Sequence, residues 1–292
     1  MRYEGSIWRP PSEARSLILQ ATVGCSHNAC IFCVSYKKKQ YRVRGVKGIR
    51  EDLASLSESQ KRGVRRVFLA DGNALAMETG ELVEVLNLLS MELPSLERVG
   101  IYGYAKDVRE KSIDDLRRLN EADLGIIYFG LETGDDRLLR WARKGVDRKE
   151  SVAACKKIRK AGIPLSITII LGLGGPEKSE RHAISTAEAL NEIDPEYVGA
   201  LTLMTPTGTR IHEMIESGEF ELMSPMDILA ELRILLQNLD LSNCIFRTNH
   251  ASNYLPIAGT LGRDKHRLLE TLDKVLESGK TESFRPDYAR GL

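Results

Sequence analysis

Short apolar runs alternate with longer amphipathic stretches over the first two thirds of the chain. The apolar runs predict strands at residues 16–22, 66–70, 98–104, 125–131, 165–171 and 197–203. Helical periodicity occupies the intervals between them, at residues 49–61, 81–91, 113–121, 135–141, 149–161 and 179–193. Parallel strands need a helical crossover, and continuous apolar runs are typical of strands covered on both faces. The pattern therefore predicts an α/β protein with a parallel sheet.

The repeated strand–helix unit fits two architectures, an open doubly wound sheet or an incomplete barrel with six units instead of eight. We expect the second, a partial (β/α)6 TIM-like barrel. The alternation stops after Thr209, and the rest of the chain predicts helices at 211–218, 226–239 and 263–278 with a short extended piece at 245–248. We therefore expect an N-terminal arm (1–15), a barrel core (16–210) and a C-terminal helical extension (211–292) packed on the core.

Three of the five cysteines fall in one loop after the first predicted strand. Cys25, Cys30 and Cys33 have the spacing Cys-x4-Cys-x2-Cys within the stretch ATVGCSHNACIFC. Thiolates this close on a short loop can converge on one metal ion or cluster, whereas a Cys-x2-Cys pair rarely closes a relaxed disulfide. The sequence therefore predicts a metal-binding loop.

The identity of the metal stays open among three chemistries at this point. Zinc would need a fourth ligand, and His27 would have to fold back sharply to supply it. A plant-type [2Fe–2S] cluster shares the spacing but would need Cys155 or Cys244, which are far away in the chain. A [4Fe–4S] cluster needs only three cysteines when one iron is left open for another ligand, and we favour it. Cys155 and Cys244 are then expected to be buried small apolar residues.

The composition is that of an ordinary globular protein, with 42% hydrophobic and 28% charged residues among 292 and a formal net charge of +1. Such a charge gives no global attraction to nucleic acid or membrane, and no stretch approaches the roughly 20 apolar residues that span a bilayer. The N-terminus has acids and prolines without an apolar core, so we do not expect a signal peptide. An odd cysteine count with three clustered favours a reducing, cytoplasmic location.

A basic run, YKKKQYRVRGVKGIR, follows the cysteine loop at residues 36–50. One interpretation is a solvated surface around the start of a helix. The other is a patch at residues 37–50 that steers an anionic substrate or tRNA toward the cluster, so nucleic acid remains a candidate partner.

Several polar residues follow the ends of the predicted strands, where α/β folds carry their chemistry. Asp71, Glu132 and the loops at 172–175 and 205–209 lie at such ends. The glycine loop at 172–175 lacks the Lys-Ser/Thr pair of a P-loop, so we do not expect it to bind a nucleoside triphosphate.

Histidines outside the predicted barrel loops fall into two groups. A polar cluster at residues 247–254 contains Asn249, His250 and Tyr254. It is either a loop whose polar groups are satisfied within the protein or a segment on the substrate side of the site. The remaining histidines lie on polar helical stretches, where we expect them at the surface; they are His182, His212 and His266.

Four loops occur in a set order along the chain: the cysteine loop after the first strand, a polar loop after the second, GLETG after the fourth and a glycine loop after the fifth. This ordered set resembles the radical S-adenosylmethionine (SAM) superfamily over about residues 16–210. The stretch FGLETGDDRLLRWARKG and the loop at 206–209 are similar to the branch that holds oxygen-independent coproporphyrinogen oxidases and methylthiotransferases.

The resemblance implies roles for the first two loops. Cys25, Cys30 and Cys33 would bind three irons of a [4Fe–4S] cluster, with the open iron chelated by the amino and carboxylate groups of SAM. The backbone of Phe32 would meet the adenine. Asp71, Gly72 and Asn73 would occupy the place of the family's Gly-Gly-Glu loop, although only Gly72 matches it, and the cysteine spacing has one residue more than the commonest Cys-x3-Cys-x2-Cys.

The later loops receive roles in the same way. Glu132 would contact the ribose or the amino-acid end of SAM, and Arg143 or Lys144 its carboxylate. The loop with Gly172 and Gly174 would lie along the adenine.

The resemblance also implies an activity: reductive cleavage of SAM to a 5′-deoxyadenosyl radical, with electrons from a donor such as flavodoxin or ferredoxin. The substrate cannot be read from the residues. Two alternatives stay open, a non-catalytic iron–sulfur or zinc protein and an RNA-binding protein that uses residues 37–50.

Overall fold

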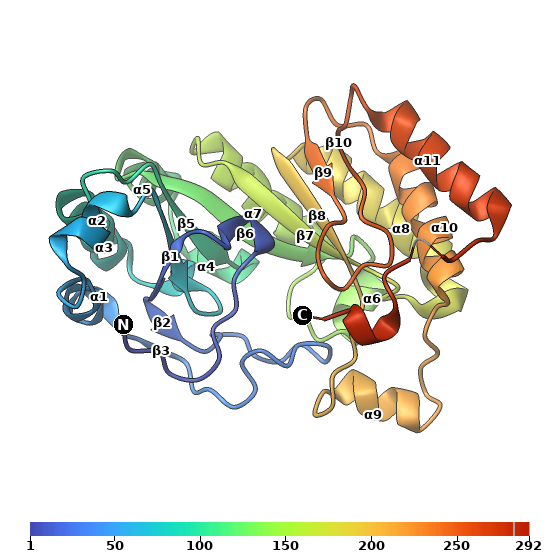
Figure 1. Cartoon of the computed structure of the whole chain (residues 1–292), viewed down its shortest axis with the longest axis horizontal. Helices are drawn as coiled ribbons and strands as arrows, with labels where there is room; N and C mark the ends of the chain where they lie inside the picture. Colours follow the sequence, from blue (N-terminus) through green and yellow to red (C-terminus); the bar gives the residue numbers. More distant parts are fainter. Residues whose placement is uncertain (283, 292) are drawn as a thin grey trace. The chain divides into compact units, whose positions relative to one another are not determined.

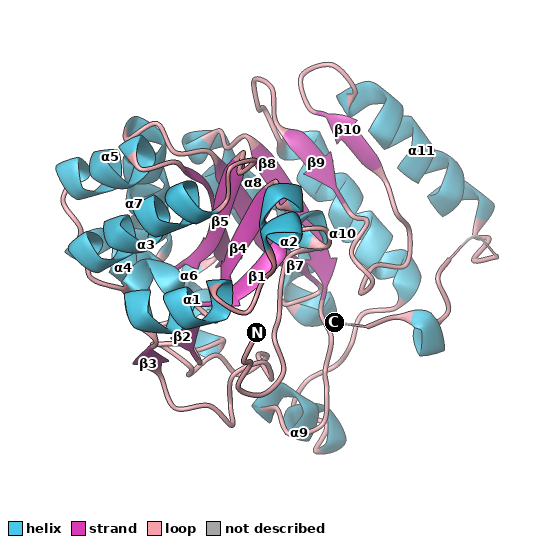
Figure 2. Ribbon diagram, turned by 60° about the vertical axis from the view of Figure 1, so that its left-hand side comes forward, coloured by secondary structure: helices cyan, strands magenta, loops and turns pink. Residues whose placement is uncertain are grey.

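The computed structural model describes residues 1–282 and 284–291 (Figures 1 and 2). The chain forms two compact units. The first comprises Met1–Asn28, Ser35–Phe129 and Ala153–Leu165, and the second comprises Ala29–Val34, Gly130–Val152 and Ser166–Leu292. The cysteine loop and strand β6 (Leu124–Glu132) each contribute residues to both units.

Parallel strands form the centre of the first unit. β1 (Leu17–Gln20), β4 (Arg66–Ala70), β5 (Arg98–Gly103) and the start of β6 are hydrogen-bonded neighbours in that order, with Leu19 opposite Leu69. These strands are nearly continuous apolar runs, and Phe68 and Ile101 are fully buried. Two short strands, β2 (Thr22–Val23) and β3 (Arg42–Val43), pair antiparallel on either side of the cysteine loop in the chain.

Helices follow most strands of the first unit, and local capping decides several of their starts. The helices are α1 (Gly45–Leu53), α2 (Glu58–Gly63), α3 (Thr79–Glu92), α4 (Ala105–Glu110) and α5 (Ile113–Glu121), with 3₁₀ turns at Pro11–Glu13 and Ala74–Ala76, and α7 (Arg148–Lys160) contributes residues to both units. Ser57 and Gln60 form a capping box that starts α2, and Ser112 and Asp115 start α5 in the same way. Such boxes satisfy backbone N–H groups that would otherwise lack partners at a helix start.

The second unit combines parallel strands with a short antiparallel edge. β7 (Leu165–Leu171) pairs with β8 (Tyr197–Thr202), β8 with β9 (Ile245–Arg247), and β10 (Ala258–Thr260) lies antiparallel to β9. Its helices are α6 (Asp136–Trp141), α8 (Gly175–Ile193), α9 (Arg210–Glu216), α10 (Pro225–Asn238) and α11 (Lys265–Ser278), with a 3₁₀ turn at Asp287–Ala289. Helix α10 packs against both α8 and α11, as both views show.

The predicted fold class is confirmed: the protein is α/β, and the described residues form a mostly parallel sheet of eight strands. Two predicted strands match the structure residue for residue, β4 and β7. The helix predicted at 49–61 is wrong, because the Ser57 cap restarts the chain as α2 after α1 has ended. The short helix α4 and the strand β10 carry too few residues to show a period, and the sequence did not predict them. The boundaries of the predicted arm, core and extension stay a prediction.

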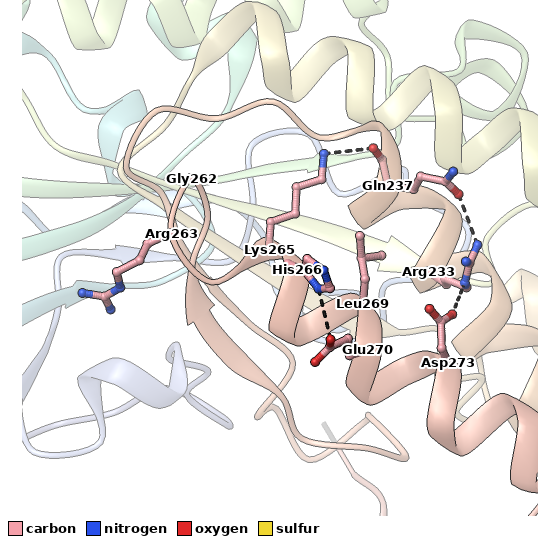
Figure 3. A pocket seen from close by; sticks show the side chains of 9 residues that line it. All are labelled: Arg233, Gln237, Gly262, Arg263, Lys265, His266, Leu269, Glu270 and Asp273. Atoms are coloured by element: carbon pink, nitrogen blue, oxygen red, sulfur yellow. Dashed lines mark hydrogen bonds and ion pairs between the residues drawn. The ribbon is translucent and has the colours of Figure 1, made fainter.

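A groove of about 490 Å³ lies between α10 and α11 and is lined by charged side chains (Figure 3). Most of these charged side chains have partners that also line the groove. Arg233 pairs with Asp273, the Nδ1 of His266 lies 3.4 Å from Glu270, and Lys265 donates to the carbonyl oxygen of Gln237 at 2.9 Å. The groove therefore presents little unbalanced charge, and His266 is exposed as predicted.

Among the described residues, no helix combines the length and apolarity that crossing a membrane requires.

The packing of α10 generates a stability prediction. Leu236 on α10 is fully buried, so Leu236→Ala leaves a cavity and should lower the free energy of unfolding by about 2–5 kcal/mol. Met91 on α3 is 75% exposed, and Met91→Ala should change it by less than about 0.5 kcal/mol. Urea unfolding followed by circular dichroism measures both. Equal effects of the two substitutions would contradict the packing of α10.

Candidate functional site

The first part of the cysteine loop lies against the loop that follows β4. Gly24, in the left-handed region with φ +74°, precedes Cys25. A Cβ added to Gly72 would lie 2.7 Å from both the Cβ of Cys25 and the carbonyl oxygen of Gly24. Only glycine allows this close approach, so the structure brings together Cys25 and the predicted residue Gly72.

Asp71 anchors this region through its side chain. Its Oδ2 accepts hydrogen bonds from Lys39 Nζ at 2.6 Å, Gln20 Nε2 at 3.2 Å and the Gly24 amide at 3.3 Å, and the carboxylate is fully buried. The backbone N–H of Asp71 donates to the hydroxyl of Thr22. Asp71 therefore joins Gln20, Gly24 and Lys39 through one carboxylate oxygen, and this oxygen already has protein partners.

Asn73 joins the cysteine loop to a buried acid that the sequence did not single out, Asp107. The Nδ2 of Asn73 donates to Asp107 Oδ2 at 2.8 Å and to Ser26 Oγ at 2.7 Å, while its Oδ1 accepts from the Ser26 amide at 3.0 Å. Burial raises the pKa of Asp107 to about 6, although hydrogen bonds from Asn73 and from the Tyr104 amide act in the opposite direction. The sequence offered one indication that Asp107 belongs to this region, its position four residues after the end of β5.

The second part of the cysteine loop belongs to the other unit. The amide of Ile31 donates to the Ala142 carbonyl at 3.1 Å, and the Ile31 carbonyl accepts from the Ile211 amide at 3.3 Å. Phe32 packs against the apolar cluster formed by Ile170, Leu173, Leu203 and Ile211. The structure thus brings Phe32 against the end of β7 and the loop that follows it, and the predicted roles of both segments stay a prediction.

The chemistry of the loop fits a bound group. Cys25, Cys30 and Cys33 are partly exposed, whereas Cys155 and Cys244 are fully buried as predicted. Within residues 1–282 and 284–291, no three His, Cys, Asp or Glu side chains converge closely enough to hold a metal ion. The case for a bound metal cluster therefore rests on the type of donor, because three partly exposed cysteines lie on one loop.

Unpartnered polar atoms beside the loop support the same fit. The Tyr41 hydroxyl, Asn28 Oδ1 and Asp71 Oδ1 are buried and make no hydrogen bond within the described part of the chain. Burial, with the nearby charges of Asp107, Cys25 and Glu81, raises the pKa of Tyr41 to about 12. Buried polar atoms without partners are rare, and a ligand beside the loop would supply partners.

The predicted residues of the GLETG segment are partly brought together. Glu132, with φ +65°, ends β6, and its Oε1 lies 2.7 Å from Lys144 Nζ in a nearly buried ion pair. Gly130 leaves room for this pair, because a Cβ there would collide with the Glu132 carboxylate. Arg143 is exposed and adopts φ +54°. Of the two basic candidates, Lys144 is therefore the one held at the strand end.

The glycine loop after β7 also receives a protein anchor. Gly172, with φ +79°, donates its N–H to Glu231 Oε1 at 2.7 Å. Gly174 stands at the N-cap of α8. The sequence predicted Gly172 and Gly174 but missed Glu231, because a glutamate in an amphipathic helix carries no local sign of burial.

The predicted substrate-side residues occupy different environments. His250 Nδ1 lies 2.9 Å from Ser252 Oγ, and burial with the charge of Arg285 lowers the pKa of His250. Tyr254 is buried beneath Arg290, whose guanidinium lies 3.9 Å from the ring centroid. Asn249 is exposed. Their role toward a substrate stays a prediction.

Comparisons with known proteins agree on one family. A profile of the radical SAM superfamily matches residues 19–189. The heme chaperone HemW of Bacillus subtilis is 21% identical over 184 residues, which cover 62% of this chain and 48% of that protein. A tRNA-2-methylthio-N(6)-dimethylallyladenosine synthase of Bordetella petrii is 25% identical over 182 residues, covering 59% and 37%.

Among solved structures, coproporphyrinogen III oxidase (HemN) from Escherichia coli, a radical SAM enzyme, superposes with a TM-score of 0.54 at 17% identity. The match covers 76% of this chain and 52% of that chain, and it shows a shared fold. This chain spans about half or less of the length of the curated relatives described above.

The close approach of Gly72 generates a prediction about the cysteine loop. In Gly72→Ala, the new methyl group would push against Cys25, so we expect a severalfold loss of bound iron after anaerobic reconstitution. Gly80, on the exposed start of α3, has no heavy atom within 4 Å of an added Cβ, so Gly80→Ala should bind iron like the wild type. Iron analysis per chain measures both, and full iron loading of Gly72→Ala would refute the contact.

The environment of Asp107 generates a pH prediction. Since its pKa rises from 3.8 to about 6 in the folded state, the folded protein keeps a proton that the unfolded chain releases between these values. The free energy of unfolding should therefore fall as pH rises from 4 to 7, by about 2 kcal/mol from this group. Asp107→Asn should remove that part of the pH dependence, and Asp114→Asn, at an exposed carboxylate, should keep it. Urea unfolding at pH 4 and at pH 7 tests this. The prediction would be contradicted if the free energy of unfolding changed equally between the two pH values in wild type and in Asp107→Asn.

Proposed function

Because this chain belongs to the radical SAM superfamily, whose enzymes use a [4Fe–4S] cluster and SAM, we propose that it cleaves SAM reductively and generates a 5′-deoxyadenosyl radical that acts on a further substrate. A [4Fe–4S] cluster held by the cysteine loop would supply the electron for this cleavage, since iron–sulfur centres can reach strongly negative potentials. The single observation that supports the proposal best is the cysteine loop, whose three cysteines are partly exposed and whose Phe32 packs against Ile170 and Leu173.

We assign Cys25, Cys30 and Cys33 as the ligands of three irons. Phe32 and the loop at 172–174 would hold the adenine, since Phe32 already packs on Ile170 and Leu173. The backbone at 71–73 would receive the amino group of SAM, because Asp71 Oδ2 and the Asn73 side-chain amide already bind protein partners.

The Glu132–Lys144 pair would meet the polar end or the ribose of SAM. A carboxylate ligand would share the Lys144 ammonium with Glu132, and the pair would hold both side chains at fixed positions before SAM binds. Such fixed side chains at a strand end orient the cofactor and help to keep water away from a reactive radical.

The protein would take its electron from a small donor such as flavodoxin or ferredoxin and work in the cytoplasm, where the thiols stay reduced. The RNA-binding alternative receives less support from the structure. Lys39 and Arg44, two cations of the basic run, pair with the buried acids Asp71 and Asp52. These two side chains stabilise the fold, so the run offers less charge to a polyanion than its sequence suggests.

Anaerobic reconstitution tests the proposed function. We expect about four irons per chain and formation of 5′-deoxyadenosine after addition of dithionite and SAM. Cys30→Ala should lose most of the iron and all of the nucleoside product, while Cys155→Ala, at a buried cysteine that we do not assign to the cluster, should retain both.

Two outcomes would overturn the proposal. One zinc per chain in place of iron would identify a zinc protein. A full iron complement without SAM cleavage in the reduced protein would identify a non-catalytic iron–sulfur protein.

A further inference from the structure

A buried polar cluster lies beneath the loops that follow β6 and β7. Its central members are His182 on α8 and Glu231 on α10, which are 2% and 0% exposed. The sequence predicted His182 at the surface, and that prediction is wrong because this face of α8, with Ala183 and Thr186, packs inward. The proposed function assigns neither residue to the cluster or to SAM.

His182 connects the end of β7 to the GLETG segment. Its Nε2 lies 3.0 Å from the carbonyl oxygen of Ile170, so Nε2 carries a proton and donates it. In the neutral ring Nδ1 is then an acceptor, and the Thr133 hydroxyl donates to it at 2.8 Å. One helical turn later, Thr186 Oγ1 accepts from the Gly134 amide at 3.0 Å. Helix α8 therefore holds residues 133 and 134 at two successive points.

Glu231 connects the glycine loop to α10. Its Oε1 accepts the Gly172 N–H at 2.7 Å, and its Oε2 accepts the Ser179 hydroxyl at 2.6 Å. The same Oε1 lies 3.6 Å from His182 Nε2. A Cβ on Gly172 would come within 2.6 Å of Ile228, so α10 packs directly on the glycine. Helix α10 thereby sets the backbone position of the loop.

A buried carboxylate is costly unless hydrogen bonds compensate it, and Glu231 accepts from two donors, the Gly172 N–H in the loop after β7 and the Ser179 hydroxyl on α8. The arrangement gives the loops after β6 and β7 a common support. His182 binds the first through Thr133, Glu231 binds the second through Gly172, and the two side chains lie next to each other.

We propose that Glu231 and His182 are positioning residues for the SAM-binding loops. Glu231 fixes Gly172 where the adenine would bind, and His182 fixes Thr133, the residue that directly follows Glu132. This inference rests on the proposed function. It assigns a role in cofactor binding to α10, a helix of the C-terminal part of the chain that the family profile does not reach.

The test compares Glu231→Ala with Glu231→Gln in cluster-loaded protein. Alanine removes both acceptors, whereas the glutamine Oε1 can still accept the Gly172 N–H and its Nε2 can donate to Ser179. We expect the Kd for SAM to rise about tenfold in Glu231→Ala, because that variant loses hydrogen bonds to a charged group. In Glu231→Gln the hydrogen bonds are retained, so the Kd should rise only about twofold. The KM for SAM should follow the Kd, with kcat for 5′-deoxyadenosine changed much less.

Asp273→Ala is the matched control, because Asp273 is a carboxylate of α11 that pairs with Arg233 on α10 but does not contact the loop. It should bind SAM like the wild type. Ser179→Ala removes a single partner at a partly buried position, so it tests the same cluster even if Glu231→Ala fails to fold. We expect its Kd for SAM to rise about threefold.

Hydrogen exchange gives a readout that does not depend on activity. The Gly172 amide should exchange faster in Glu231→Ala than in wild type or Asp273→Ala, because its acceptor is gone. Unchanged SAM affinity and exchange in folded Glu231→Ala, or in Ser179→Ala if the first variant is unfolded, would overturn the inference. Failure of the wild type itself to bind iron or cleave SAM would instead overturn the proposed function.

Discussion

The buried ion pair between Asp71 and Lys39 closes the cysteine loop at both ends. The same Asp71 oxygen accepts the amide of Gly24, just before Cys25, and the ammonium of Lys39, six residues after Cys33. Removing one partner of a buried pair leaves an uncompensated charge, so both ends of the loop depend on this carboxylate. Gly72, the next residue, can then lie against Cys25, so the position of this first cysteine depends on the anchor at the end of β4.

Buried acids recur as anchors at the other loops. Asp107 holds Asn73, Glu132 holds Lys144 and Glu231 holds Gly172. In each case a carboxylate accepts hydrogen bonds from the protein or pairs with an ammonium. These acids therefore shape the loops at which they lie. A site built in this way holds its loops in place before a cofactor arrives.

The last third of the chain contributes strands to the sheet of the second unit and a contact to the glycine loop. Strands β9 and β10 continue the sheet of the second unit, and α10 reaches back to the glycine loop through Glu231. In the same region, Arg290 covers Tyr254. The predicted substrate-side residues therefore belong to a part of the chain that lies beyond the residues matched by the superfamily profile.

The sequence by itself determined the α/β class, most strands and helices, and the cysteine loop, because apolar runs, helical periods and cysteine spacing are properties of neighbouring residues. It did not reveal the burial of His182 or the roles of Asp107 and Glu231. Their partners lie far away in the chain: Thr133 is 49 residues from His182, and Gly172 is 59 residues from Glu231. Only the tertiary structure brings such groups together, and for a polar side chain in an amphipathic helix, the partner it meets decides whether it is a solvated charge or a buried anchor.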